Sequence, residues 1–280
     1  MDTEDKERPS ARHMNTPILE LRNITKWFGP EGHGVLAVDD CTVKVQKGEF
    51  ICVVGPSGCG KSTLMTVAAG LEKPTRGEVL VEGRPAGPPG PKRSVVFQRF
   101  ALFPSETVAQ NIKFGLQMAR VNAAEQERRL AEQLRIMGLE QFRDAYPNQL
   151  SGGMQQRVAI ARALVMQPEI LLMDEPFGAL DAQTRTILQE EIQRLHREQH
   201  YTVLFITPSV EEAVYLGDRV IVMSRRPGRI KKEIILPRDV SWKSGDIEAA
   251  AEHPDFIKAR REIWALVREE IVANSNGRQD

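Results

Sequence analysis

The chain has 280 residues, of which 38 are basic and 38 acidic, so its formal net charge at pH 7 is zero. That balance gives no general electrostatic attraction to nucleic acid or to anionic lipid. No apolar run approaches the roughly 18 residues that a membrane-spanning helix needs, and the charged N-terminus lacks the apolar centre of a signal peptide. The three cysteines have no metal-ligand spacing and suit a reducing compartment. We therefore expect a soluble cytoplasmic protein that does not bind nucleic acid.

The predicted elements alternate between strands and helices along the chain. Residues 1–16 are polar and charged, so we expect them to be disordered. Short apolar or alternating runs predict strands at 18–21, 38–45, 50–54, 79–81, 95–97, 170–173, 203–206 and 220–223. Helical patterns occur at 61–69, within 107–147, at 157–164 and at 254–272. This order predicts an α/β fold in which a parallel sheet has helices on both faces, with a helical insertion near 105–150.

The strongest local signal is the segment Gly55, Pro56, Ser57, Gly58, Cys59, Gly60, Lys61 and Ser62, which we call the phosphate loop. It directly follows a predicted strand and opens a predicted helix. Glycines allow backbone N–H groups to turn toward phosphates, and the helix N-terminus adds positive potential. Lys61 is placed to reach the β- and γ-phosphates, and the Ser62 hydroxyl to hold magnesium. An ordinary glycine turn before Lys-Ser is the competing interpretation, but the strand–loop–helix context makes it much the weaker one.

A second site element is the pair Asp174 and Glu175, which follows a predicted buried strand. A strand delivers such carboxylates to the carboxyl edge of a parallel sheet, where ligands bind. Asp174 fits a magnesium partner, and Glu175 fits the group that polarises an attacking water. Two acids after a strand also occur as a solvated turn, so the functional interpretation depends on the phosphate loop.

A third element is the segment 150–156 (LSGGMQQ), which precedes a helical run. Ser151 is placed to cap that helix, and Gly152 and Gly153 expose N–H donors at its tip. Taken alone, this segment is more simply a loop and an N-cap. The order of the phosphate loop, Gln98, this signature segment, Asp174–Glu175 and Asp181 resembles the ATPase subunit of ABC transporters over roughly residues 18–236.

The resemblance implies roles for further residues. Phe28 occupies the position of an aromatic that stacks on adenine, although Trp27 and a plain packing role compete with that assignment. Thr63 completes the phosphate loop, and Gln98 resembles the glutamine that contacts magnesium and the attacking water. Ser151, Gly152 and Gly153 resemble the segment that binds ATP held by the opposite subunit, and Asp181 resembles the acid that links the two sites. The implied assembly is a closed pair, either a homodimer or a pair with a related subunit, which ATP holds together.

The resemblance also implies a domain arrangement and a set of partners. We expect an ABC ATPase domain at 17–240, with an antiparallel β edge and a helical subdomain at about 105–165, followed by a linker and helix at 241–280. The segment 224–230 and the short tail resemble the nitrate, sulfonate and taurine importer branch. Two transmembrane permease subunits and, indirectly, a solute-binding protein are the expected partners. The expected location is peripheral, on the cytoplasmic face of the inner membrane, and the expected cofactors are ATP and Mg2+.

Alternatives from other classes are weaker. A small GTPase would need an Asn-Lys-x-Asp element, and ABC-type ATPases of DNA repair or translation need a coiled-coil insertion or a second cassette. A more serious alternative is an ATP-dependent dimerising switch with little turnover. The family places a histidine after the strand that corresponds to 203–206, and this chain has Pro208 there. Proline offers neither a side-chain donor nor a backbone N–H. Ser209 and Glu212 are expected to form a capping box for the next helix, and His196 and His200 offer no obvious substitute for the missing histidine.

Overall fold

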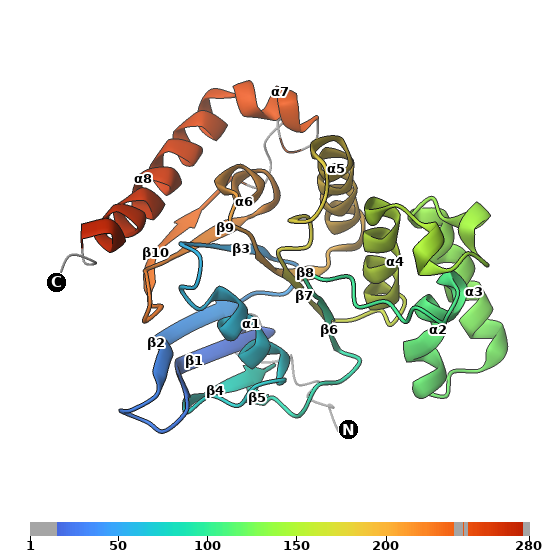
Figure 1. Cartoon of the computed structure of the whole chain (residues 1–280), viewed down its shortest axis with the longest axis horizontal. Helices are drawn as coiled ribbons and strands as arrows, with labels where there is room; N and C mark the ends of the chain where they lie inside the picture. The colour runs from blue at the N-terminus through green and yellow to red at the C-terminus, as the bar shows by residue number, and fades with distance from the viewer. Residues whose placement is uncertain (1–15, 238–242, 244–245, 277–280) are drawn as a thin grey trace, which may run out of the picture.

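The computed structural model describes residues 16–237, 243 and 246–276. Residues 1–15 of the segment predicted to be disordered, and residues 241, 242, 244 and 245 of the predicted linker, therefore fall outside the described residues. Two sheets and a set of helices make up the described part (Figure 1). Among these residues, no helix is both long enough and apolar enough to cross a membrane.

A six-stranded sheet forms the centre of the molecule, in the order β10-β9-β3-β8-β7-β6. The strands from β9 to β6 run parallel, and β10 joins the edge antiparallel to β9. The bounds are β10 Ile230–Ile235, β9 Arg219–Met223, β3 Phe50–Val54, β8 Thr202–Ile206, β7 Ile170–Asp174 and β6 Arg93–Val96. The predicted parallel sheet is therefore present, with one further edge strand, β10, that the sequence pattern did not reveal.

A second, antiparallel sheet has the order β2-β1-β4-β5. Its strands are β2 Val35–Val45, β1 Leu19–Phe28, β4 Arg76–Val81 and β5 Arg84–Pro85. The prediction for β1 ended at residue 21, but pairing with β2 continues as far as Phe28 across register shifts. This extension is important for function because it carries Phe28 to the edge of the candidate site.

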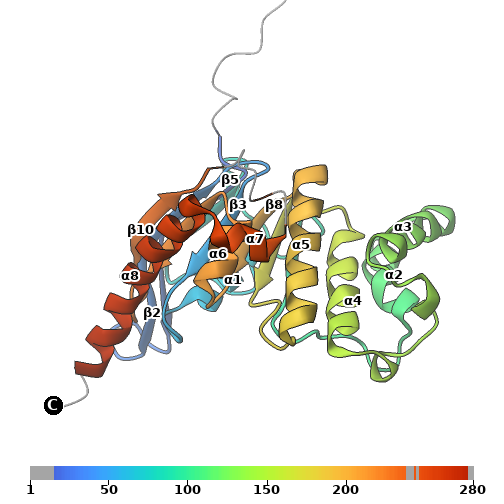
Figure 2. The same ribbon diagram turned by 90° about the horizontal axis from the view of Figure 1, so that it is seen from above.

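The helices pack on both faces of the central sheet. Their bounds are α1 Lys61–Ala69, α2 Val108–Met118, α3 Ala123–Ile136, α4 Gly152–Leu164, α5 Ala182–Gln199, α6 Val210–Leu216, α7 Ile247–Glu252 and α8 Pro254–Asn276, with short 3-10 turns at Glu140–Phe142 and Pro147–Gln149. Helices α2, α3 and α4 form a lobe at one end of the molecule, and α8 lies at the other end, seen most clearly from above (Figure 2). Helix α1 lies between the central sheet and the antiparallel sheet.

Alternation along β3 divides the interior into two cores. Phe50, Cys52 and Val54 face a core that includes residues of α4, α5, α6 and α8. Ile51 and Val53 face a second core, which is shared with α1 and the antiparallel sheet. All five β3 residues are buried, as expected for a parallel strand that is covered on both faces. The strand therefore ends at a fixed place, and the phosphate loop begins directly after it.

Candidate functional site

The phosphate loop connects the end of β3 to the start of α1. Gly60 is the N-cap of α1 and has φ 104°, a conformation that favours glycine. A Cβ at Gly60 would also lie 2.7 Å from the Ala37 carbonyl oxygen. Gly58, with φ 74°, makes a second left-handed turn within the loop. Glycines at these two positions therefore let the loop turn tightly back onto the N-terminus of α1.

A pocket of about 270 Å³ lies over this loop. Residues from the antiparallel sheet, the phosphate loop, the end of β7 and the segment after β9 line it: Phe28, Val35, Ala37, Ser57, Gly58, Gly60, Lys61, Ser62, Thr63, Glu175 and Arg226. Elements far apart in the sequence thus meet at one edge of the central sheet, as expected for the carboxyl ends of parallel strands. Eight of the predicted site residues are among them.

Lys61 is held within the loop itself. Its side chain is buried, with 5% of the residue exposed. Its Nζ donates hydrogen bonds to the carbonyl oxygens of Gly55 at 3.0 Å and Pro56 at 3.1 Å. A charged amine in this position supplies a concentrated positive charge to the pocket, where the N–H groups at the start of α1 also point.

Ser62 and Asp174 connect the loop to β7. The Ser62 hydroxyl donates to Asp174 Oδ1 at 3.1 Å. Burial raises the pKa of Asp174, and the Ser62 hydrogen bond and the Lys61 charge oppose that rise. A hydroxyl and a carboxylate within hydrogen-bond distance are hard oxygen donors of the kind that Mg2+ prefers. The donor set therefore fits magnesium.

Gln98 and Glu175 meet at the adjoining strand ends. Gln98 follows β6, and its Nε2 donates to Glu175 Oε2 at 3.3 Å. The Glu175 backbone has φ 43°, and its N–H donates to the Ile206 carbonyl oxygen at 2.9 Å. These contacts fix the Glu175 carboxylate at the pocket wall, where it could accept a proton or orient a water.

The aromatic candidates are distinguished by their position. Phe28 is 44% exposed and lines the pocket, with Lys26 Nζ 5.1 Å from its ring centroid. Its neighbour Trp27 is not among the lining residues. Of the two, Phe28 therefore has the exposed ring that a planar base could stack on.

Pro208 follows β8 and is exposed. The polar residues around it form hydrogen bonds that differ in part from the predicted capping box. Ser209 caps α6, because its Oγ accepts from the Glu212 N–H at 3.2 Å. The second half of the predicted capping box is wrong: the Ser209 N–H donates to Thr207 Oγ1 at 2.9 Å instead. The Thr207 hydroxyl donates to the Glu212 carboxylate, which also accepts from Gln189 Nε2 at 2.7 Å. Glu212 is buried, so it finds these partners in the interior rather than at the exposed helix end.

The two histidines considered as substitutes lie at the opposite end of β3. The ring of His196 stacks edge-on against Phe50, the first residue of β3, with centroids 5.2 Å apart. His200 lies beside Gly48, just before the same strand, because a Cβ added at Gly48 would be 3.5 Å from the His200 carbonyl oxygen. The phosphate loop follows the far end of β3, so neither histidine reaches Pro208.

The signature segment and Asp181 lie together, apart from the pocket. Ser151 caps α4 as predicted, because its Oγ accepts from the Met154 N–H at 3.3 Å. A Cβ at Gly153 would lie 2.3 Å from Thr184 in the first turn of α5. Asp181 caps that same turn, because it accepts from the Thr184 N–H at 3.0 Å, and this bond is the main cause that lowers its pKa. None of the signature residues, nor Asp181, is among the residues that line the described pocket.

Three residues that line the pocket were not predicted from the sequence, namely Val35, Ala37 and the charged residue Arg226. The segment 224–230 resembles one importer branch, but nothing in its local pattern indicates a contact with the phosphate loop. The three cysteines, by contrast, are free and buried, and burial raises the pKa of the Cys59 thiol in the loop. Cys59 therefore has the features of a packing residue rather than a reactive one.

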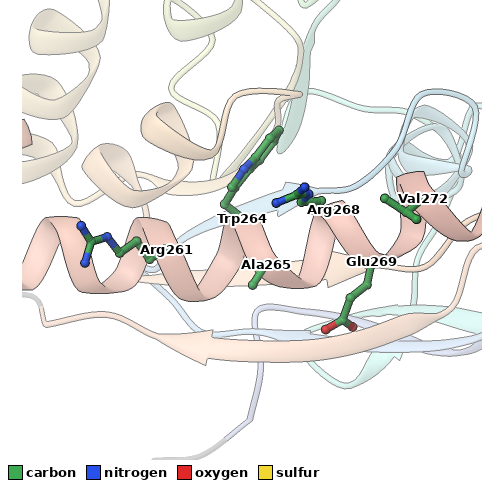
Figure 3. A pocket seen from close by; sticks show the side chains of 6 residues that line it. All are labelled: Arg261, Trp264, Ala265, Arg268, Glu269 and Val272. Carbon is green, nitrogen blue, oxygen red and sulfur yellow. The ribbon is translucent and has the colours of Figure 1, made fainter.

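A second, wider surface pocket of about 620 Å³ lies along α8. Its lining residues all belong to that helix: Arg261, Trp264, Ala265, Arg268, Glu269 and Val272 (Figure 3). None of the predicted site residues is among them. The phosphate-loop pocket therefore remains the candidate site.

Comparisons with known proteins agree with this geometry. Residues 38–178 match the family model described as "ABC transporter". An uncharacterized ABC transporter ATP-binding protein of Methanocaldococcus jannaschii is 46% identical over 91% of this chain and 92% of its own. The taurine import ATP-binding protein of Pelagibacter ubique is 44% identical over 87% of this chain and 93% of its own. The nitrate import ATP-binding protein of a Synechocystis strain is 42% identical over 89% of this chain and 95% of its own.

Solved structures show the same architecture. The dimeric post-hydrolysis structure of the ATP-binding cassette MJ0796, bound to ADP and Pi, has a TM-score of 0.70 and 33% identity, covering 79% of this chain and 99% of that one. CbiO1 from Clostridium perfringens is described as part of the ABC transporter complex CbiONQ. It has a TM-score of 0.71 and 25% identity, covering 87% of this chain and 94% of that one. These matches confirm the predicted fold class. The chain therefore belongs to the ABC transporter family, as one of its ATP-binding ATPase subunits.

Proposed function

We propose that this subunit uses the phosphate-loop pocket to bind and hydrolyse ATP, and so drives the import of a small anionic or zwitterionic solute. The observation that carries the proposal is the meeting of two sequence-distant pairs, Ser62 with Asp174 and Gln98 with Glu175, beside the loop in which Lys61 is held, at one sheet edge. Binding of phosphates and activation of water require these groups at adjacent positions.

Each residue has a distinct task in this proposal. Phe28 stacks on adenine, and Lys61 with the loop N–H groups neutralises the phosphates. Thr63, at the first turn of α1, contacts the phosphate chain. Ser62, Asp174 and Gln98 would hold Mg2+, which would supply positive charge that offsets the charge of the phosphates. Glu175 orients the attacking water and accepts its proton, and the hydrogen bond from Gln98 keeps its carboxylate aimed at the pocket.

A second copy completes the site in this proposal. Ser151, Gly152, Gly153 and Asp181 form a unit around the first turns of α4 and α5, but they do not line the pocket of their own chain. A twofold pair would place this unit of each protomer over the ATP of its partner. The dimeric state of the similar MJ0796 cassette supports such a pair.

The transport assignment rests on the relatives. Proteins named for taurine import and nitrate import cover nearly the whole chain at 44% and 42% identity. We infer a complex of two ATPase subunits with two transmembrane permease subunits and a solute-binding protein, located at the cytoplasmic face of the membrane. Nitrate, sulfonate or taurine is the proposed solute class.

Pro208 supports a second candidate function. A chain that binds ATP and dimerises, but hydrolyses slowly because a donor is missing beside the transferred phosphate, would act as an ATP-dependent switch. The position of Pro208 after β8 favours this alternative, because His196 and His200 lie at the far end of β3 and do not replace the missing donor.

Two measurements test the proposed function. Purified protein should bind ATP with Mg2+ and release phosphate, and ATP binding without release would favour the switch. Disruption of the gene in its host should abolish uptake of labelled taurine, an alkanesulfonate or nitrate, and a plasmid copy should restore it. Normal uptake of all three in the disrupted strain would contradict the substrate class but not the ATPase activity.

A further inference from the structure

Arg226 is a cation in the nucleotide pocket that no described acid neutralises. It lines the pocket together with Lys61 and Thr63. Among the described residues, its side chain has no hydrogen bond or ion pair, whereas Arg229 of the same segment pairs with Asp39. A guanidinium with unused donors at the wall of a phosphate-binding pocket is suited to an anionic ligand, because its planar fork matches phosphate oxygens.

The segment that carries Arg226 is packed directly on the phosphate loop. The Gly228 N–H donates to the Ala37 carbonyl oxygen at 2.9 Å, and the Gly228 carbonyl accepts from the Asp39 N–H at 2.9 Å. A Cβ at Gly228 would lie 2.0 Å from the Cys59 carbonyl oxygen, so only glycine permits this approach. Arg226 is two residues away, and its backbone is therefore fixed relative to the loop that would hold the phosphates.

Helix α8 holds the same segment from the other side. Glu270 Oε2 accepts from the Arg225 N–H at 3.0 Å, and Glu270 Oε1 accepts from Lys231 Nζ at 2.7 Å. The preceding residue, Glu269, projects from α8 toward β10 and also pairs with Lys231, at 2.8 Å, whereas Trp264 projects from the opposite side of the helix (Figure 3). Glu270 therefore joins α8 to the backbone next to Arg226, and Glu269 does not.

We propose that the Arg226 guanidinium binds the phosphate chain of the nucleotide, and that Glu270 of α8 is the positioning residue that holds it there. The proposal rests on the nucleotide site proposed above. It makes the C-terminal helix a part of the binding site, because the anchoring of α8 sets the position of a phosphate ligand. Loosening of the Glu270 contact would then weaken ATP binding without a change in any residue that touches ATP.

The test is displacement of a fluorescent ATP analogue from the full-length protein by ATP, ADP and adenosine. Arg226→Ala should weaken ATP and ADP binding by roughly ten- to a hundredfold, the range for loss of one charge-assisted hydrogen bond. Adenosine should compete as it does with wild type, and Arg226→Lys should recover part of the loss. Arg229→Ala, which removes a cation of the same segment outside the pocket, is the matched control and should leave the affinities unchanged.

Unchanged ATP affinity in Arg226→Ala, while wild type binds ATP, would overturn the inference and leave the proposed function intact. An equal loss of affinity for adenosine would also overturn the inference, because the guanidinium would then contact the base or maintain the shape of the pocket and not bind the phosphates. Failure of wild type to bind ATP would instead overturn the proposed function.

The role of Glu270 is tested with a second set of variants. Glu270→Ala should weaken ATP binding, and the double variant Glu270→Ala/Arg226→Ala should bind ATP no more weakly than Arg226→Ala alone. Glu269→Ala is its control, and additive losses would exclude a positioning role.

Discussion

The Gln98 side-chain amide donates a hydrogen bond to the Glu175 carboxylate at 3.3 Å, which connects the ends of β6 and β7 at the pocket wall. The two residues are 77 positions apart in the sequence. This contact holds one carboxylate oxygen of Glu175, a residue that lines the pocket.

Glu175→Gln should separate ATP binding from ATP hydrolysis. The amide keeps the shape of the side chain but cannot accept a proton, so phosphate release should fall about 10²- to 10⁴-fold. ATP should remain bound, and dimer should accumulate in size-exclusion chromatography with ATP and Mg2+. Glu132→Gln, on the exposed face of α3, is a control that should behave as wild type. A Glu175→Gln protein that stays strictly monomeric with ATP would count against the two-copy site.

Lys61→Ala should remove tight ATP binding. The buried ammonium is the group in the phosphate loop that carries a full positive charge, and uncharged N–H groups cannot replace it. We expect a loss of roughly a hundredfold or more in affinity, measured by calorimetry. Lys92→Ala, which breaks a surface ion pair with Glu169, is the control for general loss of charge. Wild-type affinity in Lys61→Ala would refute the assignment of the phosphate loop.

Pro208→His should raise turnover if the missing donor limits hydrolysis. One preorganised donor is typically worth about 10² to 10³ in rate, so the gain should be large compared with the change in ATP affinity. Pro208→Ala, which removes the ring and adds no side-chain donor, is the matched control. Phosphate release is measured for the three proteins side by side. Equal turnover in wild type and Pro208→His would mean that Thr207, Ser209 or water already supplies the donor, or that a partner subunit does.

Glu212→Gln should change how stability depends on pH. Burial raises the pKa of Glu212 above its ordinary 4.5, although hydrogen bonds with Thr207 and Gln189 oppose the rise. A carboxyl with a raised folded-state pKa binds its proton more tightly in the folded chain, so its contribution to stability is lost as pH rises from 4.5 through the folded pKa. The glutamine variant lacks this loss. Urea unfolding at pH 5 and pH 8 should therefore show a smaller fall in the free energy of unfolding for the variant than for wild type. A parallel pH dependence of the two proteins would show that Glu212 does not titrate differently in the folded chain.

Elements with strong local signals were predictable from the sequence. Residues 50–54 and 61–69 are a strand and a helix with the predicted bounds, because a continuous apolar run and a glycine loop mark them. Strand β10 was missed because its sequence, IKKEII, places three charged residues in a row and lacks the alternation of a half-buried strand. The described contacts of the Lys231 side chain are with α8, which the local sequence does not reveal. Helix α4 begins at Gly152, five residues before the start of the helix predicted at 157–164. The earlier start is possible because the Ser151 side chain caps the helix, although its first two residues are glycines.

The candidate site was predictable where a motif carries its own chemistry. The phosphate loop, Asp174 and Glu175 belong to this class, and the structure brings them together with Gln98. Arg226 could not be found in this way, because it reaches the pocket only through the packing of Gly228 against Cys59. The predicted bond from Glu212 to its own helix end failed for a similar reason, since the buried partners Thr207 and Gln189 come from other elements.

The alternation of β3 between two cores has a consequence for how this site tolerates changes in chain length. Insertion or deletion of one residue in the strand would exchange the side chains that face each core and would move Gly55 by about 3.3 Å along the sheet. Because protein interiors are close-packed, we expect that neither core would accept the other's side chains without repacking, and that the strand would not slide to compensate. The packing of β3 between the two cores therefore fixes the position of the phosphate loop along the sheet. A length change within β3 should abolish cooperative unfolding and nucleotide binding together, whereas Lys61→Ala should affect binding and leave cooperative unfolding in place.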